Sequence, residues 1–269
     1  MAWDPSDYLT YADERGRPYG ELLARVAVEP DRVRRVVDLG CGPGNLTALL
    51  GRRWPDATVV GVDSSPEMLE RARRDHADVP GLSFARGDVR TWTASAPVDV
   101  LLSNATYQWV PGHLDLLPGL LAQVAPGGVL AFSVPGNVDE PSHVLRRELA
   151  ATAPYAMFTA GVADPAAHDA AAYLGVLAGA GAQVDAWETT YLHVLRGEDP
   201  VLTWISSTGA RPTLEALPAD LRERFRSELG ELLRAAYPTT VVGGEPAVVL
   251  PFRRVFVVAR RVDGVVTEQ

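Results

Sequence analysis

The stretch DLGCGPGN, from Asp38 to Asn45, decides the fold because it joins the apolar pair Val36-Val37 to the segment LTALLGRRW. Three glycines at every second position allow positive φ angles and let the backbone approach a ligand closely. The helix predicted from Leu46 to about Arg53 directs its free N–H groups into the same space. The stretch therefore predicts a strand, a ligand-binding loop and a helix in succession.

Two nucleotide-binding motifs use such a loop, and the sequence departs from both. A P-loop requires Gly-Lys-Ser/Thr after its second glycine, and the dinucleotide fingerprint G-x-G-x-x-G requires glycine at its sixth position. This chain has Asn45 at the sixth position and no lysine nearby. Asp38, two residues before the first glycine, would repel phosphates but suits a cationic or zwitterionic ligand. The loop thus favours S-adenosylmethionine, with its sulfonium and ammonium groups, over the NAD of an oxidoreductase.

Composition limits the class of protein. With 269 residues and 47% hydrophobic content, the chain can form one large α/β domain. We expect a cytoplasmic protein without a membrane-spanning segment, because no leader-like run and no window of about 20 apolar residues is present. The single cysteine excludes a disulfide framework, and no Cys/His spacing predicts a metal site. The net charge of −9 disfavours nucleic acid as a partner, so an anionic substrate would need a local cationic pocket.

Hydrophobic periodicity alternates between strand and helix, which predicts a doubly wound α/β sheet. Strands are expected at residues 35–39, 58–62, 82–85, 98–103, 129–134, 183–195 and 248–259. Helices are expected at residues 67–76, with Ser65 as N-cap and Pro66 at the first helical position, and at 166–179. A helix is also expected at 113–124, where the triplet Pro126-Gly127-Gly128 would end it. Further helices at 141–150, 199–206 and 219–237 have no neighbouring strand. We therefore expect one domain over residues 1–269, with a helical lid formed by segments of about 136–165 and 199–245.

Polar residues follow the predicted strands at the edge where ligands bind in open α/β sheets. Asp63, after the second strand, can accept both ribose hydroxyls of either NAD or S-adenosylmethionine and does not discriminate between them. Asp88, after the third strand, can accept a hydrogen bond from an adenine amino group. The fourth strand is followed by a polar turn, residues 103–109, that ends in aromatic side chains. Three acids at three successive strand ends indicate one shared site.

Most of these residues also have a simpler explanation. Asp63 can cap the following helix, and Asp88 can be an ordinary turn residue after Gly87. Cys41 can be a small side chain in a crowded loop. Met68 can belong to the core, although its helical turn would also lie beside the adenine, and Trp109 can serve packing.

Several segments together resemble the trans-aconitate 2-methyltransferases, a branch of the class I S-adenosylmethionine-dependent methyltransferases. In the first half these are DLGCGPGN, GVDSSPEML, GDVRTW and SNATYQWVPGH. The segments WDPSDYLTYADERGRP, DEPSHVLRRE, WETTYLHVL, TWISSTGARP and LPFRRVFVVARR extend the resemblance over nearly the whole chain. Residues 153–165 depart from the family pattern, which bears on the lid and on the identity of the substrate.

The resemblance implies a Rossmann-like, seven-stranded sheet whose last strand runs antiparallel, and methylation of one carboxylate of trans-aconitate to the monomethyl ester. It places Asp38 and the glycine loop around the methionine part, Asp63 on the ribose, Asp88 and Val89 at the adenine, and Asn104 below the sulfonium. The candidate cofactor-binding residues are Asp38, Gly40, Cys41, Gly42, Asn45, Asp63, Ser64, Met68, Asp88, Val89, Asn104 and Ala105. The candidate substrate-binding residues are Arg211 and Arg254 as cationic grips, with Tyr8, Trp109, His143, Tyr191 and His193 lining the space.

A carboxylate substrate would need no general base, because its reference pKa of about 4 leaves it ionised at neutral pH. We therefore assign no catalytic residue. Arg253 and Arg254 are adjacent in a predicted strand, so at most one side chain enters the pocket, and the family pattern selects Arg254. The alternatives are that Arg254 pairs with an acid to fasten the strand, that the substrate is another small carboxylic acid or an acyl thioester, and that the protein is a non-catalytic S-adenosylmethionine-binding module. Oligomeric state is not predicted by the sequence.

Overall fold

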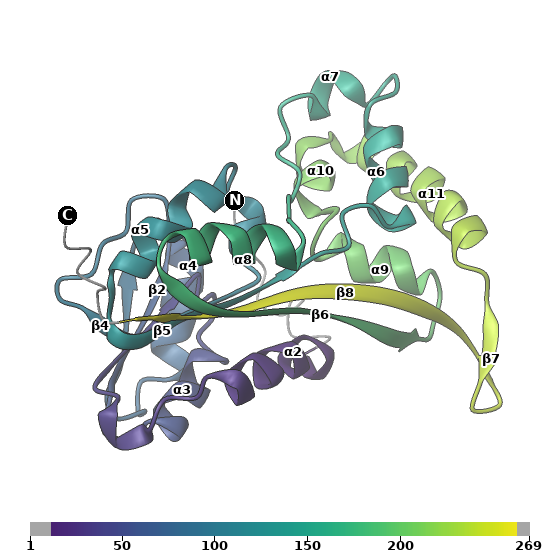
Figure 1. The fold of residues 1–269 in the computed structure, drawn as a ribbon. Coiled ribbons are helices and arrows are strands. Elements are labelled where there is room, and N and C mark those ends of the chain that lie inside the picture. Colours follow the sequence, from purple (N-terminus) through teal and green to yellow (C-terminus); the bar gives the residue numbers. More distant parts are fainter. Residues whose placement is uncertain (1–11, 263–269) are drawn as a thin grey trace. The chain divides into compact units, whose positions relative to one another are not determined.

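A sheet of eight strands organises the chain, and the computed structural model describes residues 12–262 of it (Figure 1). The strand order is β3-β2-β1-β4-β5-β8-β6, and β7 pairs only with β8. The strands are β1 (Arg35–Leu39), β2 (Thr58–Asp63), β3 (Leu82–Arg86), β4 (Val98–Asn104), β5 (Val124–Pro135), β6 (Ala182–Leu195), β7 (Thr240–Val242) and β8 (Glu245–Arg261). Strands β1 to β5 pair in parallel, and the order reverses between β1 and β4. The doubly wound α/β prediction is confirmed.

The last long strand, β8, runs antiparallel to β5. The backbone N–H of Gly136, just after β5, donates to the carbonyl of Arg253 in the middle of β8. At the other end, the Arg261 side chain donates to the carbonyl of Val124, where β5 begins. Because the start of one strand lies beside the end of the other, the two strands have opposite directions, as the family resemblance implies.

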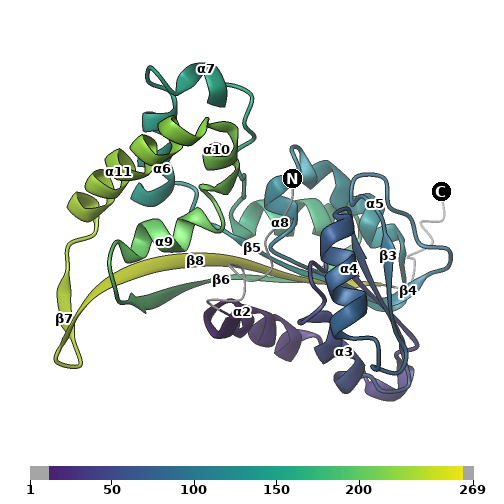
Figure 2. The same ribbon diagram turned by 180° about the vertical axis from the view of Figure 1, so that it is seen from behind.

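Helices cover both faces of the sheet. Figures 1 and 2 show α2 (Ala12–Arg25) and α3 (Thr47–Arg53) on one side, and α5 (Leu117–Ala122) and α8 (Ala170–Gly179) on the other. The apolar core between the sheet and the second pair includes Val37, Leu101, Leu121, Leu130, Phe132, Tyr173, Leu177 and Val257. Each such side chain contributes about 1.5–3 kcal/mol when fully buried, so this layer fixes where the strands end.

Local sequence explains the helix starts. Helix α4 (Pro66–Asp75) begins as predicted, because the Ser65 hydroxyl accepts a hydrogen bond from the Met68 backbone N–H at 3.2 Å and Pro66 occupies the first turn. Helix α8 begins four residues later than predicted, at Ala170, where the Asp169 side chain accepts from the Ala172 N–H at 2.8 Å. A side-chain cap therefore sets each start.

The predicted helix at 113–124 is wrong in its extent. The structure has a 3-10 turn, η3 (His113–Leu116), and then the short α5, and β5 already begins at Val124. The Pro126-Gly127-Gly128 triplet, expected to end a helix, lies inside β5. It forms an irregularity in the pairing with β4, whose register shifts between Val98 and Val100. A side chain on Gly128 would meet the Asp99 carbonyl oxygen at 2.6 Å, so glycine is needed for this close strand pairing.

The chain divides into two compact units. The sheet unit consists of the described residues up to Val134, Ala167–Glu188 and the residues from Val255 onward; the helical unit consists of Pro135–Ala166 and Thr189–Arg254. The helices of the second are α6 (Pro141–Ala150), α7 (Ala156–Thr159), α9 (Pro200–Ser206), α10 (Arg211–Ala216) and α11 (Ala219–Ala236). Both segments that were expected to form a lid fall within the helical unit. The single domain and the action of a lid stay predictions.

Within the helical unit, α11 packs against α6 and α9 (Figure 2). The Tyr155 ring meets the Phe225 ring edge-on at 4.9 Å, and its hydroxyl donates to Glu228 at 2.9 Å. The Tyr237 hydroxyl accepts from the Ser142 N–H, which α6 leaves free in its first turn. These contacts fix the start of α6, where His143 lies.

Candidate functional site

The three glycines of the first loop have positive φ angles and separate roles. The φ angles are 76° at Gly40, 55° at Gly42 and 79° at Gly44. A side chain on Gly40 would meet the Thr106 hydroxyl oxygen at 2.0 Å, and one on Gly44 would meet Phe84 at 2.6 Å. At Gly42 no atom of residues 12–262, apart from those of Gly42 and its two chain neighbours, lies within 4 Å of that position. Gly40 and Gly44 thus permit close packing of the loop, whereas Gly42 leaves its backbone open to a ligand.

Asp38, at the end of β1, is a buried carboxylate with 3% exposure. One of its oxygens accepts a hydrogen bond from the Thr47 hydroxyl at 2.6 Å. Burial raises the pKa of Asp38 to about 6; the Thr47 hydrogen bond opposes this rise, and the charge of Asp63 adds to it. A buried carboxylate in this state is stabilised by a neighbouring cation, so Asp38 fits an ammonium group.

Asp63, at the end of β2, holds the glycine loop. One carboxylate oxygen accepts from the Gly42 N–H at 2.9 Å, and the other accepts from the Ser65 N–H at 2.8 Å. Ser64, which lies between Asp63 and Ser65 in the sequence, is exposed. The contact with Ser65 supports the simpler explanation of Asp63 as part of a helix start. Each oxygen keeps a second lone pair, so a ribose contact is chemically compatible and stays a prediction.

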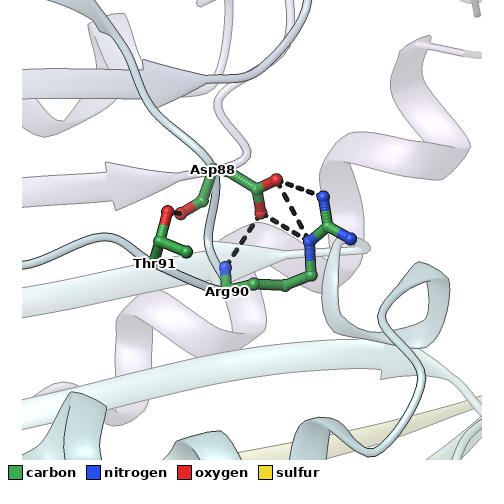
Figure 3. A network of polar contacts seen from close by, with 3 residues as sticks. All are labelled: Asp88, Arg90 and Thr91. Carbon is green, nitrogen blue, oxygen red and sulfur yellow. Dashed lines mark hydrogen bonds and ion pairs between the residues drawn. The ribbon is translucent and has the colours of Figure 1, made fainter.

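Asp88 forms an ion pair with Arg90 just after β3 (Figure 3). The Arg90 Nε lies 3.0 and 3.1 Å from the two carboxylate oxygens, Nη2 contacts one of them, and the Arg90 backbone N–H donates at 3.0 Å. These hydrogen bonds lower the pKa of Asp88. The geometry supports the turn explanation, but exposed ion pairs contribute only about 0–1 kcal/mol, so an adenine amino group could share this carboxylate.

Three further cofactor candidates lie among packed side chains. Met68 and Cys41 are buried, and the Cys41 sulfur would lie 2.9 Å from a side chain on Gly61. Burial raises the pKa of the Cys41 thiol, which therefore stays protonated. Val89 is half-buried against the core. These positions favour the packing explanation for Met68 and Cys41, and a ligand contact by any of the three stays a prediction.

The turn after β4 is held in a strained conformation beside the glycine loop. Asn104 accepts from the Ser133 hydroxyl at 2.6 Å through Oδ1, and the Ala105 N–H donates to the Ser133 carbonyl at 2.8 Å. Ala105 has a φ angle of 55°, which is uncommon for a residue other than glycine and is found preferentially at functional sites. Because β1 and β4 are adjacent and lie where the strand order reverses, this turn and the loop after Asp38 lie at the edge where ligands bind in open α/β sheets.

Two polar residues near the loop were missed by the sequence analysis. Thr47 binds the Asp38 carboxylate, and Tyr19 of α2 is fully buried with no hydrogen-bond partner for its hydroxyl in the described part of the chain. Burial raises the pKa of Tyr19, and the charge of Asp38 raises it further. Thr47 could have been found as a hydroxyl on the first turn of the helix after the loop. Nothing in the sequence connects Tyr19 with Asp38.

The substrate candidates in the helical unit form two groups. Around β6 and β8, the His193 ring lies 4.7 Å from Trp204 and 5.6 Å from Phe252, Tyr191 stacks on His193, and the buried Arg254 guanidinium lies 5.4 Å from the Phe252 ring. The second group is carried by α6 and α10. His143 is buried in the first turn of α6, and Arg211 begins α10 and pairs with Glu215 at 2.6 Å.

Three other positions complete the candidates. Arg253 lies as predicted beside Arg254, but its Nε donates to the Gly136 carbonyl at 2.7 Å, so it ties β8 to the end of β5. Trp109 is half-buried in the 3-10 turn η2 (Tyr107–Trp109) of the sheet unit. Tyr8 lies outside the described residues.

Residues 12–262 contain no candidate membrane span and no candidate metal site. No helix there is both long enough and apolar enough to cross a membrane. Across the same residues, no group of three His, Cys, Asp or Glu side chains could hold a metal ion.

Comparison with known proteins defines the class first. A family described as a methyltransferase domain matches residues 36–128, which contain the glycine loop, Asp63, Asp88 and Asn104. The crystal structure of the YcgJ protein from Bacillus subtilis matches 93% of this chain and 100% of its own with a TM-score of 0.61, at 14% identity. The fold is therefore that of the methyltransferases.

Sequence relatives define the family more narrowly. Trans-aconitate 2-methyltransferase of Streptomyces avermitilis is 52% identical over 97% of both chains. The protein of the same name from Streptomyces coelicolor is 50% identical over 97% of this chain and 88% of its own. The chain belongs to the trans-aconitate 2-methyltransferase family.

Proposed function

We propose that this protein transfers a methyl group from S-adenosylmethionine to a carboxylate oxygen of trans-aconitate, giving the monomethyl ester. The observation that carries the proposal is the identity of about half of all residues, over nearly the full length, with proteins of that activity by name. The matched length covers 97% of this chain and so includes the helical unit, where most substrate candidates lie.

The residues at the ligand-binding edge fit the methyl donor. The open backbone at Gly42 and the buried carboxylate of Asp38 suit a ligand that carries an ammonium group, and no phosphate-binding lysine is needed. Asp38 and the loop from Gly40 to Asn45 bind the methionine part, Asp63 the ribose, and Asp88 with Val89 the adenine. When bound, S-adenosylmethionine supplies an electrophilic methyl group attached to a sulfonium.

The substrate candidates supply what a tricarboxylate needs. A trianion approaching a protein of net charge −9 requires local positive charge, which Arg254 and Arg211 provide. Guanidinium groups that bind the reacting carboxylate too tightly would reduce its nucleophilicity. We therefore assign them to the carboxylates that are not methylated, with Tyr191, His193, His143, Trp109 and Tyr8 lining the site.

The reaction places few demands on proton transfer. The substrate carboxylate is already ionised at neutral pH, so no general base is assigned. Alignment of oxygen, methyl carbon and sulfur in one line can lower the barrier by up to about 7–11 kcal/mol. The protein acts by binding and orienting both ligands and by keeping water from the methyl group.

A panel of possible substrates tests the proposal. The purified protein is incubated with labelled S-adenosylmethionine and with di- and tricarboxylates or acyl thioesters, and methyl esters are identified by mass spectrometry. Trans-aconitate monomethyl ester as the preferred product supports the proposal. Preference for another acid or thioester would retain a methyltransferase with a different substrate. Binding without any transfer would favour a non-catalytic cofactor-binding module.

Placement in the cytoplasm and the absence of a nucleic-acid partner stay predictions that rest on sequence composition. A small-molecule substrate is consistent with the family.

A further inference from the structure

His143 carries a buried ring nitrogen that the fold itself does not use. The residue lies in the first turn of α6, is 8% exposed, and its Nδ1 has no hydrogen-bond partner within the described residues. A buried polar atom without a partner destabilises a fold by about 1–3 kcal/mol, so native proteins keep few of them. Such an atom indicates a ligand contact when the side chain is also held in place.

Gly209 holds the ring in place. A side chain on Gly209 would lie 2.5 Å from Cε1 of His143 and 3.3 Å from each of its two ring nitrogens. The backbone of Gly209 is not among the positive-φ glycines, so its conformation does not demand glycine. The absence of a side chain at this position is therefore explained by the imidazole ring, which fills the space. The contact between the His143 ring and Gly209 therefore joins α6 to the segment TGARP.

Burial and the charges around His143 keep the imidazole neutral. Burial, with the positive charges of Arg146 and Arg147, lowers its pKa to about 4, and only Asp164 opposes this shift. Arg146 donates to the Thr213 hydroxyl at 2.7 Å and pairs with Asp164, and Arg147 donates to the Val138 carbonyl at 2.7 Å. The neighbouring cations are thus fixed by contacts of their own. A neutral imidazole has one N–H donor, on either Nδ1 or Nε2.

We propose that His143 is a substrate-binding residue that donates a hydrogen bond from Nδ1 to a carboxylate that is not methylated, and that Gly209 is the residue that positions its ring. This rests on the proposed function, because a tricarboxylate at neutral pH offers only acceptors and so requires the Nδ1–H tautomer. From the sequence, His143 is predicted to lie near the substrate, but neither the binding atom nor the role of Gly209 can be predicted. A neutral donor adds directional binding without the strong charge pairing of a guanidinium.

A matched pair of amides tests which nitrogen binds. The side-chain amide of asparagine reaches the position of Nδ1, whereas that of glutamine reaches the position of Nε2. We expect His143→Gln to raise KM for trans-aconitate by about tenfold and His143→Asn by less than about threefold, with kcat and cofactor affinity near wild type. Gly209→Ala should raise KM like His143→Gln, because it displaces the ring.

Nitrogen-15 NMR of histidine-labelled wild-type protein provides a measurement that does not depend on the variants folding. Trans-aconitate should convert His143 to the Nδ1–H tautomer or retain it there, and should shift the Nδ1 resonance. An Nε2–H tautomer in the complex, or equal KM values for the two amide variants, would overturn the proposal. If wild-type protein methylates only another acid, the proposed function fails, and the same comparison is then made with that acid.

Discussion

At the scale of single residues, the site depends on carboxylates whose surroundings differ. Asp38 is buried and bonded to Thr47, whereas Asp63 lies at the surface of the loop and accepts two backbone N–H groups. Asp38 is the carboxylate with a raised pKa of about 6, since it loses most of its hydration. This difference supports the proposal that Asp38 binds the charged end of the cofactor and Asp63 the neutral hydroxyls.

Cofactor affinity should depend on the ionisation of Asp38. A raised pKa in the folded protein means that protonated Asp38 is the more stable form below pH 6, and that the free protein loses this stabilisation as pH rises from about 4 to 6. The ammonium group binds the ionised form, so affinity should fall by up to about tenfold per pH unit below pH 6. Calorimetric titration between pH 5 and 7.5 measures this. Asp38→Asn should bind weakly at every pH, and an equal slope in wild type and variant would assign the effect to another group.

Asp63→Ala should weaken cofactor binding and loosen the loop together. The ribose hydrogen bonds to a charged carboxylate correspond to about 1.5–3 kcal/mol, and the Gly42 and Ser65 N–H groups also lose their acceptor. Calorimetry and thermal unfolding check the two effects. Glu70→Ala, which removes an exposed acid further along the same helix, is the matched control and should change neither. Unchanged cofactor affinity in a folded Asp63→Ala protein would remove Asp63 from the ribose site.

At the scale of helices and strands, the regular elements were predictable because their signals are local. Ser65 and Pro66 mark a helix start within a few residues, and the strands β1 and β2 are apolar runs bounded by turns. The triplet Pro126 to Gly128 was assigned wrongly, because its use inside β5 depends on the irregular pairing with β4. The strand β7 was missed for the same reason, since a three-residue hairpin strand depends on its partner.

The residues of the candidate site divide in the same way. Asp38, Asp63, Asp88 and Asn104 could be predicted because strand ends and glycine spacing locate them. The burial of Tyr19 near Asp38 could not, because α2 precedes the loop without any motif that connects them. The contact of His143 with Gly209 joins segments that are far apart in the sequence, and the sequence alone contains no signal that predicts it.

The adjacent arginines of β8 provide a matched comparison at this scale. Arg254 is buried over the Phe252 ring, whereas Arg253 donates to the Gly136 carbonyl and fastens β8 to the end of β5. We expect Arg254→Met to lower kcat/KM for trans-aconitate by a factor that corresponds to about 2–4 kcal/mol of transition-state stabilisation, with cofactor affinity unchanged. The reason is that methionine keeps the apolar stem but offers no hydrogen bonds. Arg253→Met should act mainly on the melting temperature. The reverse pattern would make Arg254 structural and Arg211 the leading anion-binding residue.

At the scale of the whole molecule, the net charge of the chain and the charge of its buried arginines have opposite signs. The chain carries a net charge of −9, yet the arginines that are buried among the described side chains, Arg146 and Arg254, both lie in the helical unit. A trianionic substrate is repelled by the overall charge and must be bound by local cations. Binding of the substrate by guanidinium groups should therefore not depend on pH in the physiological range, because arginine is in general always protonated there.

The chemical step should accordingly be nearly independent of pH from about 6.5 to 8.5. The reacting carboxylate is ionised over this whole range, His143 is neutral because its pKa is lowered to about 4, and Asp38 is ionised above about pH 6. Single-turnover rates with saturating cofactor and trans-aconitate measure the step without contributions from binding. A rate that rises tenfold per pH unit would require a general base, because only deprotonation of the nucleophile or of a catalytic group produces that slope. The attacking group would then not be a carboxylate, and a substrate with a hydroxyl or an amine would replace trans-aconitate.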